Sequence, residues 1–188
     1  IDMDMIPFGQ LQLMSPKPAG ISGSETREEI NKKIKSGEIE KFELLAGKGF
    51  NRISEFSKDQ MFTFITMRAL SASPLMMGGD LPTLDNFSLK LITNKEILAC
   101  NQNGVMGELI YDKDGIEIWK TPNKLNKGGW IGIFNRDKNL KSLALDKNAL
   151  GEDLKNSSKL YDVWGDKKIA KLDFDINANG VVFLKYTN

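Results

Sequence analysis

Residues 107–121 read GELIYDKDGIEIWKT, and this stretch decides the class of fold. Apolar and polar residues alternate on both sides of Asp114–Gly115, a dipeptide that favours a two-residue hairpin turn. The stretch therefore predicts two antiparallel strands joined at that turn. Alternating segments at 129–137, 141–146, 159–165 and 167–176 predict further short strands, and Asn179–Gly180 predicts a closing hairpin over 173–187. Short strands separated by turns are typical of an antiparallel β-sandwich.

The part of the chain before this hairpin carries helix signals. The stretch Ser57–Gln60 has the pattern of a capping box, and the residues that follow, 61–73, are apolar nearly all round. These features predict a buried helix that ends at Pro74. Two further helices are expected in 84–94, with Asp85 near its start, and in 95–103.

A more irregular region occupies residues 15–56. It contains one helix pattern, at 26–36, for which Ser24 or Thr26 is the expected N-cap and Gly37 the stop. The other short element expected in this half is a buried strand at Leu75–Met77, followed by a glycine turn and Asp80.

The composition of the chain changes near residue 104. All eight methionines lie at or before Met106, and all three tryptophans lie after it. We therefore predict a boundary at Asn103–Gly104, between a first part (1–103) and a second part (104–188). The tryptophans are Trp119, Trp130 and Trp164. They are expected to pack in the core of the second part, and a sugar-stacking platform is the alternative.

Composition also excludes several classes of function. The net charge is +1, so bulk electrostatics indicate neither a nucleic-acid nor a membrane-surface partner. No stretch approaches the ~20 apolar residues of a membrane span. Since the chain has no histidine, histidine bases, Ser-His-Asp triads and histidine metal sites are excluded together. The single cysteine, Cys100, is expected to be a core residue without an internal disulfide.

The sequence predicts no metal site and no cofactor. Its nearest imitation of a calcium loop begins at Asp175, and Tyr186 stands where that loop requires a glutamate. The oligomeric state and the cell compartment stay open, with secretion or a periplasmic location among the alternatives.

The chain opens with IDMDMIPFG at residues 1–9. In an extended segment Asp2 and Asp4 share one face and Met5 faces the other way, while Pro7 ends the run. This pattern indicates a strand end that leads into a loop. Acids in such places are common in the sites of α/β barrels. A solvated terminus is the alternative.

Several stretches in order carry a resemblance to a known family. They are SASPLMMGGDLPTL (71–84), ITNKEILACNQNG (92–104), EIWKT (117–121), WIGIFNR (130–136) and LYDVWG (160–165). This series resembles the carboxyl-terminal part of the α-galactosidases of glycoside hydrolase family 27 and the related melibiase clan. The resemblance implies the terminal strands and helices of a (β/α)8 barrel in 1–103, with an insertion at about 15–56. An antiparallel β-sandwich would follow in 104–188.

The same resemblance implies a substrate site. The stretch 2–9 looks like the end of the seventh barrel strand, where Asp4 and Met5 would border the sugar pocket and Asp2 would shape the strand end. Asp80 would lie at the mouth of the eighth strand. Two departures from the family's pattern are Met3, which replaces a proline, and Arg68, which stands where the family often has tryptophan.

The resemblance implies a retaining hydrolase of terminal α-galactosides. Such an enzyme needs two carboxylates ~5–5.5 Å apart. In the resembled family both lie on earlier strands, so we expect no catalytic residue in this chain and expect the remainder of the barrel as its partner. A non-catalytic carbohydrate-binding or structural β-sandwich module, and a domain with no role toward sugars, are the alternatives.

Overall fold

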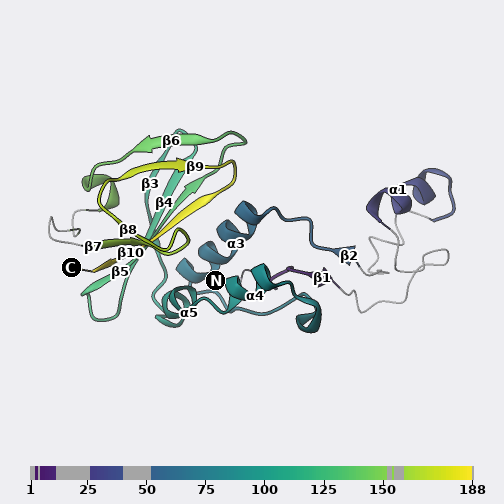
Figure 1. Cartoon of the computed structure of the whole chain (residues 1–188), viewed down its shortest axis with the longest axis horizontal. Coiled ribbons are helices and arrows are strands. Elements are labelled where there is room, and N and C mark those ends of the chain that lie inside the picture. The colour runs from purple at the N-terminus through teal and green to yellow at the C-terminus, as the bar shows by residue number, and fades with distance from the viewer. Residues whose placement is uncertain are drawn as a thin grey trace. The chain divides into compact units, whose positions relative to one another are not determined.

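A computed structural model describes residues 3, 5–11, 26–39, 52–151, 154 and 159–187. The chain divides into two compact units. The first unit comprises Ile1–Asp4, Phe56–Leu75 and Lys90–Asn188, and the second comprises Met5–Glu55 and Met76–Leu89. Together they make a mixed helix and sheet protein (Figure 1). Within the described ranges, no helix is both long enough and apolar enough to cross a membrane.

A six-stranded antiparallel sheet forms the centre of the first unit, with strand order β3-β4-β5-β10-β7-β8. A separate antiparallel pair is made by β6 and β9. The strands are β3 (Glu108–Lys113), β4 (Ile116–Pro122), β5 (Gly128–Asn135), β6 (Lys141–Ala144), β7 (Lys159–Asp162), β8 (Lys167–Ile169), β9 (Asp173–Ile176) and β10 (Val181–Thr187).

The predicted hairpin is confirmed between β3 and β4. Asp114 and Gly115 both have positive φ, at 53° and 74°, as the two central residues of a tight hairpin turn require. The pairing is irregular between Leu109 and Tyr111, where a bulge interrupts the edge strand.

The predicted closing hairpin is wrong. β9 pairs with β6, whereas β10 pairs with β5 and β7, so the turn before Gly180 leads from one sheet to the other. The single strand expected over 167–176 is also two strands, β8 and β9, which lie in different sheets. The buried amide of Asn135, at the end of β5, binds the main chain at the end of β9 and so links the two sheets there.

The core of the first unit lies between its two sheets. Alternate residues of β4, β5 and β10 meet β9 there, together with the short helix η2 (Asn148–Leu150). The fully apolar members are Ile116, Ile118, Ile131, Ile133, Leu150, Leu154, Leu160, Phe174, Ile176 and Leu184. Every residue of β5 is buried, because its other face is covered as well.

Two helices cover that other face: α3 (Lys58–Leu70) and α5 (Lys95–Gln102). The capping box predicted for α3 is confirmed, with Ser57 accepting the Gln60 N–H and the Gln60 side chain bound to the Ser57 N–H. α3 packs closely on the sheet, since a Cβ added to Gly132 would lie 2.6 Å from Leu70 Cδ1.

The second unit contains shorter elements. They are β1 (Gln10–Leu11), α1 (Arg27–Lys35), β2 (Arg52–Ile53), the 3-10 helix η1 (Leu81–Thr83) and the start of α4 (Asn86–Ile92). Of the two caps considered for α1, the structure has Thr26, which forms a capping box with Glu29. Most of the expected insertion at 15–56 lies outside the described residues, as does Ser24.

Candidate functional site

Two segments of the second unit that are far apart in the sequence lie side by side. The Ile6 N–H donates to Met76 O at 2.7 Å, and the Gly78 N–H donates to Ile6 O at 2.9 Å. Ile6 and Met77 form a parallel bridge, so the expected strand at Leu75–Met77 is reduced to this one pairing. The two segments run in the same direction at this bridge, as neighbouring strands of an α/β barrel do, and Leu11 and Gly79 form an antiparallel bridge beyond it.

A third main-chain hydrogen bond joins the same two segments farther along the chain. The Asp80 N–H donates to Gln10 O at 2.8 Å. This bond fixes the main chain of Asp80 beside the residue that begins β1.

Two adjacent glycines permit this close approach. A Cβ on Gly79 would lie 1.7 Å from Phe8 O, and a Cβ on Gly78 would lie 2.8 Å from Met5 Cβ. Neither glycine has a positive φ. The prediction of a glycine turn is therefore wrong: the absence of a side chain, rather than a turn conformation, is what the glycines supply.

The structure places two of the four predicted site residues. Met5 is 50% exposed and lies against Gly78, two residues before Asp80. Asp2 and Asp4 lie outside the described residues, so the structure leaves their predicted roles untested.

Asp80 carries a carboxylate that does not cap the short helix that follows it. It occupies the N-cap position of η1 in an extended conformation, but its side chain makes no capping bond. Its carbonyl instead accepts the Thr83 N–H at 3.2 Å and the Thr83 hydroxyl at 3.0 Å. The Asp80 side chain is half-buried beside the strand ends, where a ligand hydroxyl could donate to it.

Asp85 is close in sequence to Asp80 and differs from it in function. It lies at the start of α4, as predicted, and its carboxylate caps the helix by accepting the N–H groups of Phe87 and Ser88 and the Ser88 hydroxyl. The Ser88 main chain and then the Ser88 hydroxyl lower the pKa of Asp85 below its usual value. Asp85 is therefore a structural acid.

Two of the three tryptophans that could have formed a sugar platform join helices to the sheet, whereas the half-buried Trp119 donates to Glu117 of its own strand at 3.1 Å. Trp130 is 7% exposed, and its indole N–H donates to Glu96 of α5 at 3.2 Å. Trp164 donates to Thr66 of α3 at 2.9 Å and lies 4.8 Å from Phe62 between ring centroids. Both pack on the helix-covered face of the sheet.

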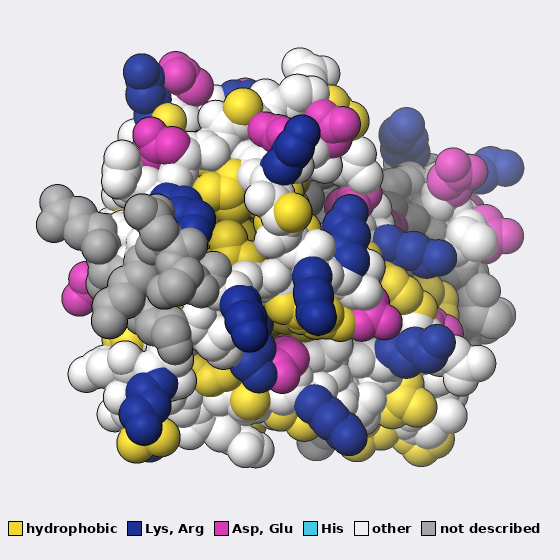
Figure 2. Space-filling view, turned by 60° about the vertical axis from the view of Figure 1, so that its left-hand side comes forward, with side chains coloured by type: hydrophobic (Ala, Val, Ile, Leu, Met, Phe, Trp, Pro, Cys, Tyr) yellow, Lys and Arg dark blue, Asp and Glu magenta, His cyan; other side chains and the backbone are white. Residues whose placement is uncertain are grey.

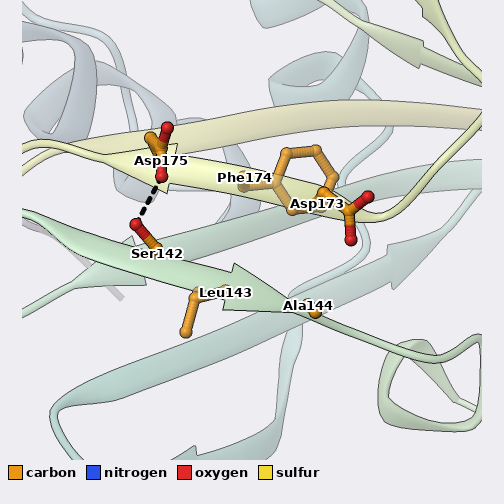
Figure 3. A pocket seen from close by; sticks show the side chains of 6 residues that line it. All are labelled: Ser142, Leu143, Ala144, Asp173, Phe174 and Asp175. Atoms are coloured by element: carbon orange, nitrogen blue, oxygen red, sulfur yellow. Dashed lines mark hydrogen bonds between the residues drawn. The ribbon is translucent and has the colours of Figure 1, made fainter.

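A shallow hollow of about 330 Å³ lies over the β6–β9 pair (Figure 3). In Figure 3 the Ser142 hydroxyl and the Asp175 carboxylate, 2.5 Å apart, point toward one another across the two strands. The hollow offers no exposed aromatic face, since Phe174 is only 8% exposed. In the part of the chain that the structure describes, no group of three or more His, Cys, Asp or Glu residues could hold a metal ion.

Charges on the surface are mixed. Lysine, acidic and hydrophobic side chains are interspersed on the face shown in Figure 2, in keeping with the net charge of +1. The described side chains on this face form no broad basic stripe of the kind that binds nucleic acid.

A parallel pair of strand ends, helices and an antiparallel sheet follow one another here as the resemblance to a glycosidase implies. Comparison with known proteins confirms that resemblance: the chain is similar to part of the α-galactosidases and of the enzymes of glycoside hydrolase family 27. No protein-family model matches the chain.

Particular relatives give the extent of the similarity. The chain is 29% identical over 98 residues to an α-galactosidase of Cyamopsis tetragonoloba, covering 51% of this chain and 24% of that protein. It is 27% identical over 132 residues to an α-galactosidase of Lachancea cidri, covering 60% and 28%. α-Galactosidase 2 of Arabidopsis thaliana is 31% identical over 68 residues, with 35% and 17% covered. The chain thus spans 17–28% of these relatives' lengths.

Solved structures share the fold. A glycoside hydrolase family 27 β-L-arabinopyranosidase from Geobacillus stearothermophilus matches with a TM-score of 0.72 and 23% identity, over 100% of this chain and 37% of that one. A putative α-N-acetylgalactosaminidase from Bacillus halodurans matches with a TM-score of 0.66 and 26% identity, over 74% and 33%.

Proposed function

We propose that this chain is the carboxyl-terminal portion of a retaining glycoside hydrolase that acts on terminal α-galactosides. The observation that carries the proposal is the pair of parallel strand ends, with the carboxylate of Asp80 beside it. The fold similarity to a family 27 enzyme, which extends over the whole chain, supports it.

This portion supplies sugar contacts and leaves the bond cleavage to another part of the enzyme. Retention needs a nucleophile and an acid/base ~5–5.5 Å apart. Within the described strand-end stretches 5–11 and 76–80, Asp80 is the only acid. In this proposal the catalytic pair lies on barrel strands outside this chain, residues 1–103 complete that barrel, and 104–188 form the sandwich.

The substrate-binding roles follow from side-chain chemistry. The Asp80 carboxylate accepts hydrogen bonds from sugar hydroxyls, and the exposed Met5 side chain packs against the apolar face of the ring. Asp4 and Asp2 supply further acceptors on the adjoining segment. The alternative, a carbohydrate-binding module, would need an exposed aromatic face. Trp130 and Trp164 are both engaged in packing, and Trp119 is half-buried and donates to Glu117.

The proposal is tested with the natural gene. We expect the reading frame upstream of the Ile1 codon to encode barrel strands, one of them ending in Lys-x-Asp. The enzyme made from that longer frame should hydrolyse 4-nitrophenyl α-galactoside and release the α-anomer first, as followed by proton NMR. The 188-residue chain alone should show no turnover. Turnover by the short chain, or no α-galactosidase activity in the longer enzyme, would contradict the proposal.

Asp80→Asn and Asp85→Asn are a matched pair for the substrate site. In the longer enzyme, Asp80→Asn should raise KM about tenfold or more, the effect of one lost bond to a charged acceptor. Asp85→Asn removes a charge five residues away from a group that caps a helix, and it should leave KM unchanged. Equal effects of the two substitutions would remove the reason to place the sugar beside Asp80.

A further inference from the structure

The two edges of the six-stranded sheet differ in character. β8 ends the sheet on one side with only 3 residues, and two of them, Lys167 and Lys168, are exposed lysines. Short strands and lysines are common means by which a protein keeps another strand from pairing with an edge. β3 ends the sheet on the other side, and its residues Leu109 and Ile110 are apolar and 44% and 37% exposed. Within the described ranges β3 pairs with β4 alone, so its outer edge is open to a further strand.

The bulge in β3 decides which of its main-chain groups point away from β4. Lys113 pairs with Ile116 across the two-residue turn, which makes theirs a hydrogen-bonded pair. Such pairs alternate along the two strands with pairs whose N–H and C=O groups point away from the partner strand, and Asp112 belongs to a pair of that second kind. Because the register shifts at the bulge, the next residue of this kind on β3 is Leu109, which pairs with Trp119. The outward main-chain groups of Asp112 and Leu109 are thus three positions apart instead of two.

This spacing allows two copies of β3 to pair antiparallel about a two-fold axis. Leu109 of each copy then lies opposite Asp112 of the other, and both residues present outward main-chain groups. A hydrogen-bonded pair exchanges two N–H···O bonds, so the two symmetry-related pairs supply ~4 main-chain hydrogen bonds. An unbulged strand has its outward groups two positions apart and could not pair with itself in this register.

The same register is complementary in charge and apolar at its centre. It sets Glu108 of each copy opposite Lys113 of the other, and both of these side chains are exposed. Ile110 of each copy meets Tyr111 of the other next to the axis, so apolar residues lie between two opposite-charge pairs. An apolar centre with a polar rim is the usual arrangement of a protein–protein interface. The registers one residue to either side would instead set Glu108 opposite an aspartate, and like charges directly opposite one another destabilise a strand pair.

We propose that two copies of this chain form a two-fold dimer through their β3 edges, with ion pairs between Glu108 of one copy and Lys113 of the other. The six-stranded sheets of the two copies then continue into one sheet across the axis. A two-fold contact uses the same patch on both copies, so the pairing closes at two copies and leaves the lysine-bearing β8 strands at the outer edges. This inference goes beyond the proposed function and does not depend on it.

Sedimentation velocity on the 188-residue chain tests the dimer. The contact is one strand wide and smaller than a standard interface, so we expect monomer at about 10 µM and dimer at about 1 mM. Glu108→Lys and Lys113→Glu each set like charges opposite one another at both ends of the contact, so each variant alone should stay monomeric over that range. An equimolar mixture of the two variants should dimerise, because every charged pair then joins a lysine of one copy to a glutamate of the other. Lys168→Glu is the control, since it makes the same change of charge at the other edge and should dimerise as the unaltered chain does.

The mixture separates a lost contact from a lost fold, because two unfolded variants could not restore one another. An unaltered chain that stays monomeric at the highest concentration would overturn the proposal. A dimer that Glu108→Lys leaves unchanged, or a mixture no more associated than its two components, would place the contact on another surface and would overturn it as well. The same measurement on the longer enzyme should also give a dimer. A longer enzyme that stays monomeric would mean that another part of it covers β3, and the proposal would then fail for the enzyme.

Discussion

Substitution of Asn135 by alanine should loosen the connection between the two sheets of the first unit. Asn135 is 1% exposed. Its amide nitrogen lies 2.7 Å from Asn139 O, 3.0 Å from Ile176 O and 3.0 Å from Asn177 O, and its Oδ1 accepts the Asp137 N–H at 2.9 Å. One side chain thus links the end of β5, the loop after it and the end of β9.

The magnitude follows from the groups left without partners. An amide has two hydrogens and serves two of the three carbonyls at a time. Each buried group left unsatisfied costs about 1–3 kcal/mol, so Asn135→Ala should lower the free energy of unfolding by about 2–5 kcal/mol. A domain of this size has about 5–15 kcal/mol in all. With a urea m-value of about 1–3 kcal/mol per M, the midpoint should fall by roughly 1–3 M.

Urea unfolding followed by the fluorescence of Trp130 and Trp164 measures this change in the first unit. Asn139→Ala is the control because Asn139 contributes only its carbonyl and is exposed. Asn135→Asp keeps the shape of the side chain and tests the direction in which stability changes with pH. Burial among carbonyl oxygens should raise the pKa of the new carboxyl, so the variant should be least stable at neutral pH and recover as falling pH protonates it. A loss below about 0.5 kcal/mol in Asn135→Ala would refute the reasoning.

Three further outcomes are expected. Gly132→Ala should lower the free energy of unfolding by about 1–3 kcal/mol, measured by urea unfolding, because its Cβ would meet Leu70 Cδ1 at 2.6 Å. Leu70→Ala should remove part of that penalty in a double-mutant cycle. Strict additivity of the two substitutions would contradict the contact. Burial, and then the Glu96 charge, raise the pKa of the Cys100 thiol. The thiol should therefore not react with Ellman's reagent until urea unfolds the chain, and fast labelling of the folded protein would contradict this. Asp85→Ala should cost about 1 kcal/mol at pH 7. Since the folded pKa of Asp85 is lowered, that difference should persist above pH ~4 and vanish as pH falls through the lowered pKa; a difference that survives at pH 2 would contradict it.

The elements that the sequence predicts correctly are those whose signals are local. The Asp114–Gly115 turn is specified by two residues that tolerate positive φ. The caps of α1 and α3 are specified by Thr26 and Ser57 with a partner three residues later. Each of these signals acts within one turn of the chain, so the surrounding fold does not have to be known.

The incorrect predictions concern which strands or segments pair with one another. A turn that closes at Gly180 is present, but β9 pairs with β6, and its end is bound by Asn135, which is more than forty residues earlier. The turn expected at Gly78–Gly79 is wrong for a similar reason. The main chain that these glycines approach, at Ile6 and Phe8, is some seventy residues away in sequence. Spacing within a segment carries no information about such neighbours.

The stretches that carry the family resemblance contain residues that join parts of the fold. Asn101 binds the end of α3, Trp164 binds Thr66 on α3, Trp130 binds Glu96 on α5, and Asn135 binds the end of β9. Side chains with such polar partners tolerate few replacements, because an unpaired buried group is costly. The similarity of these stretches to the family therefore reflects contacts that hold the fold together. The proposed function places the sugar at the strand ends 5–11 and 76–80, so substitutions there should change substrate preference without changing stability in the first unit.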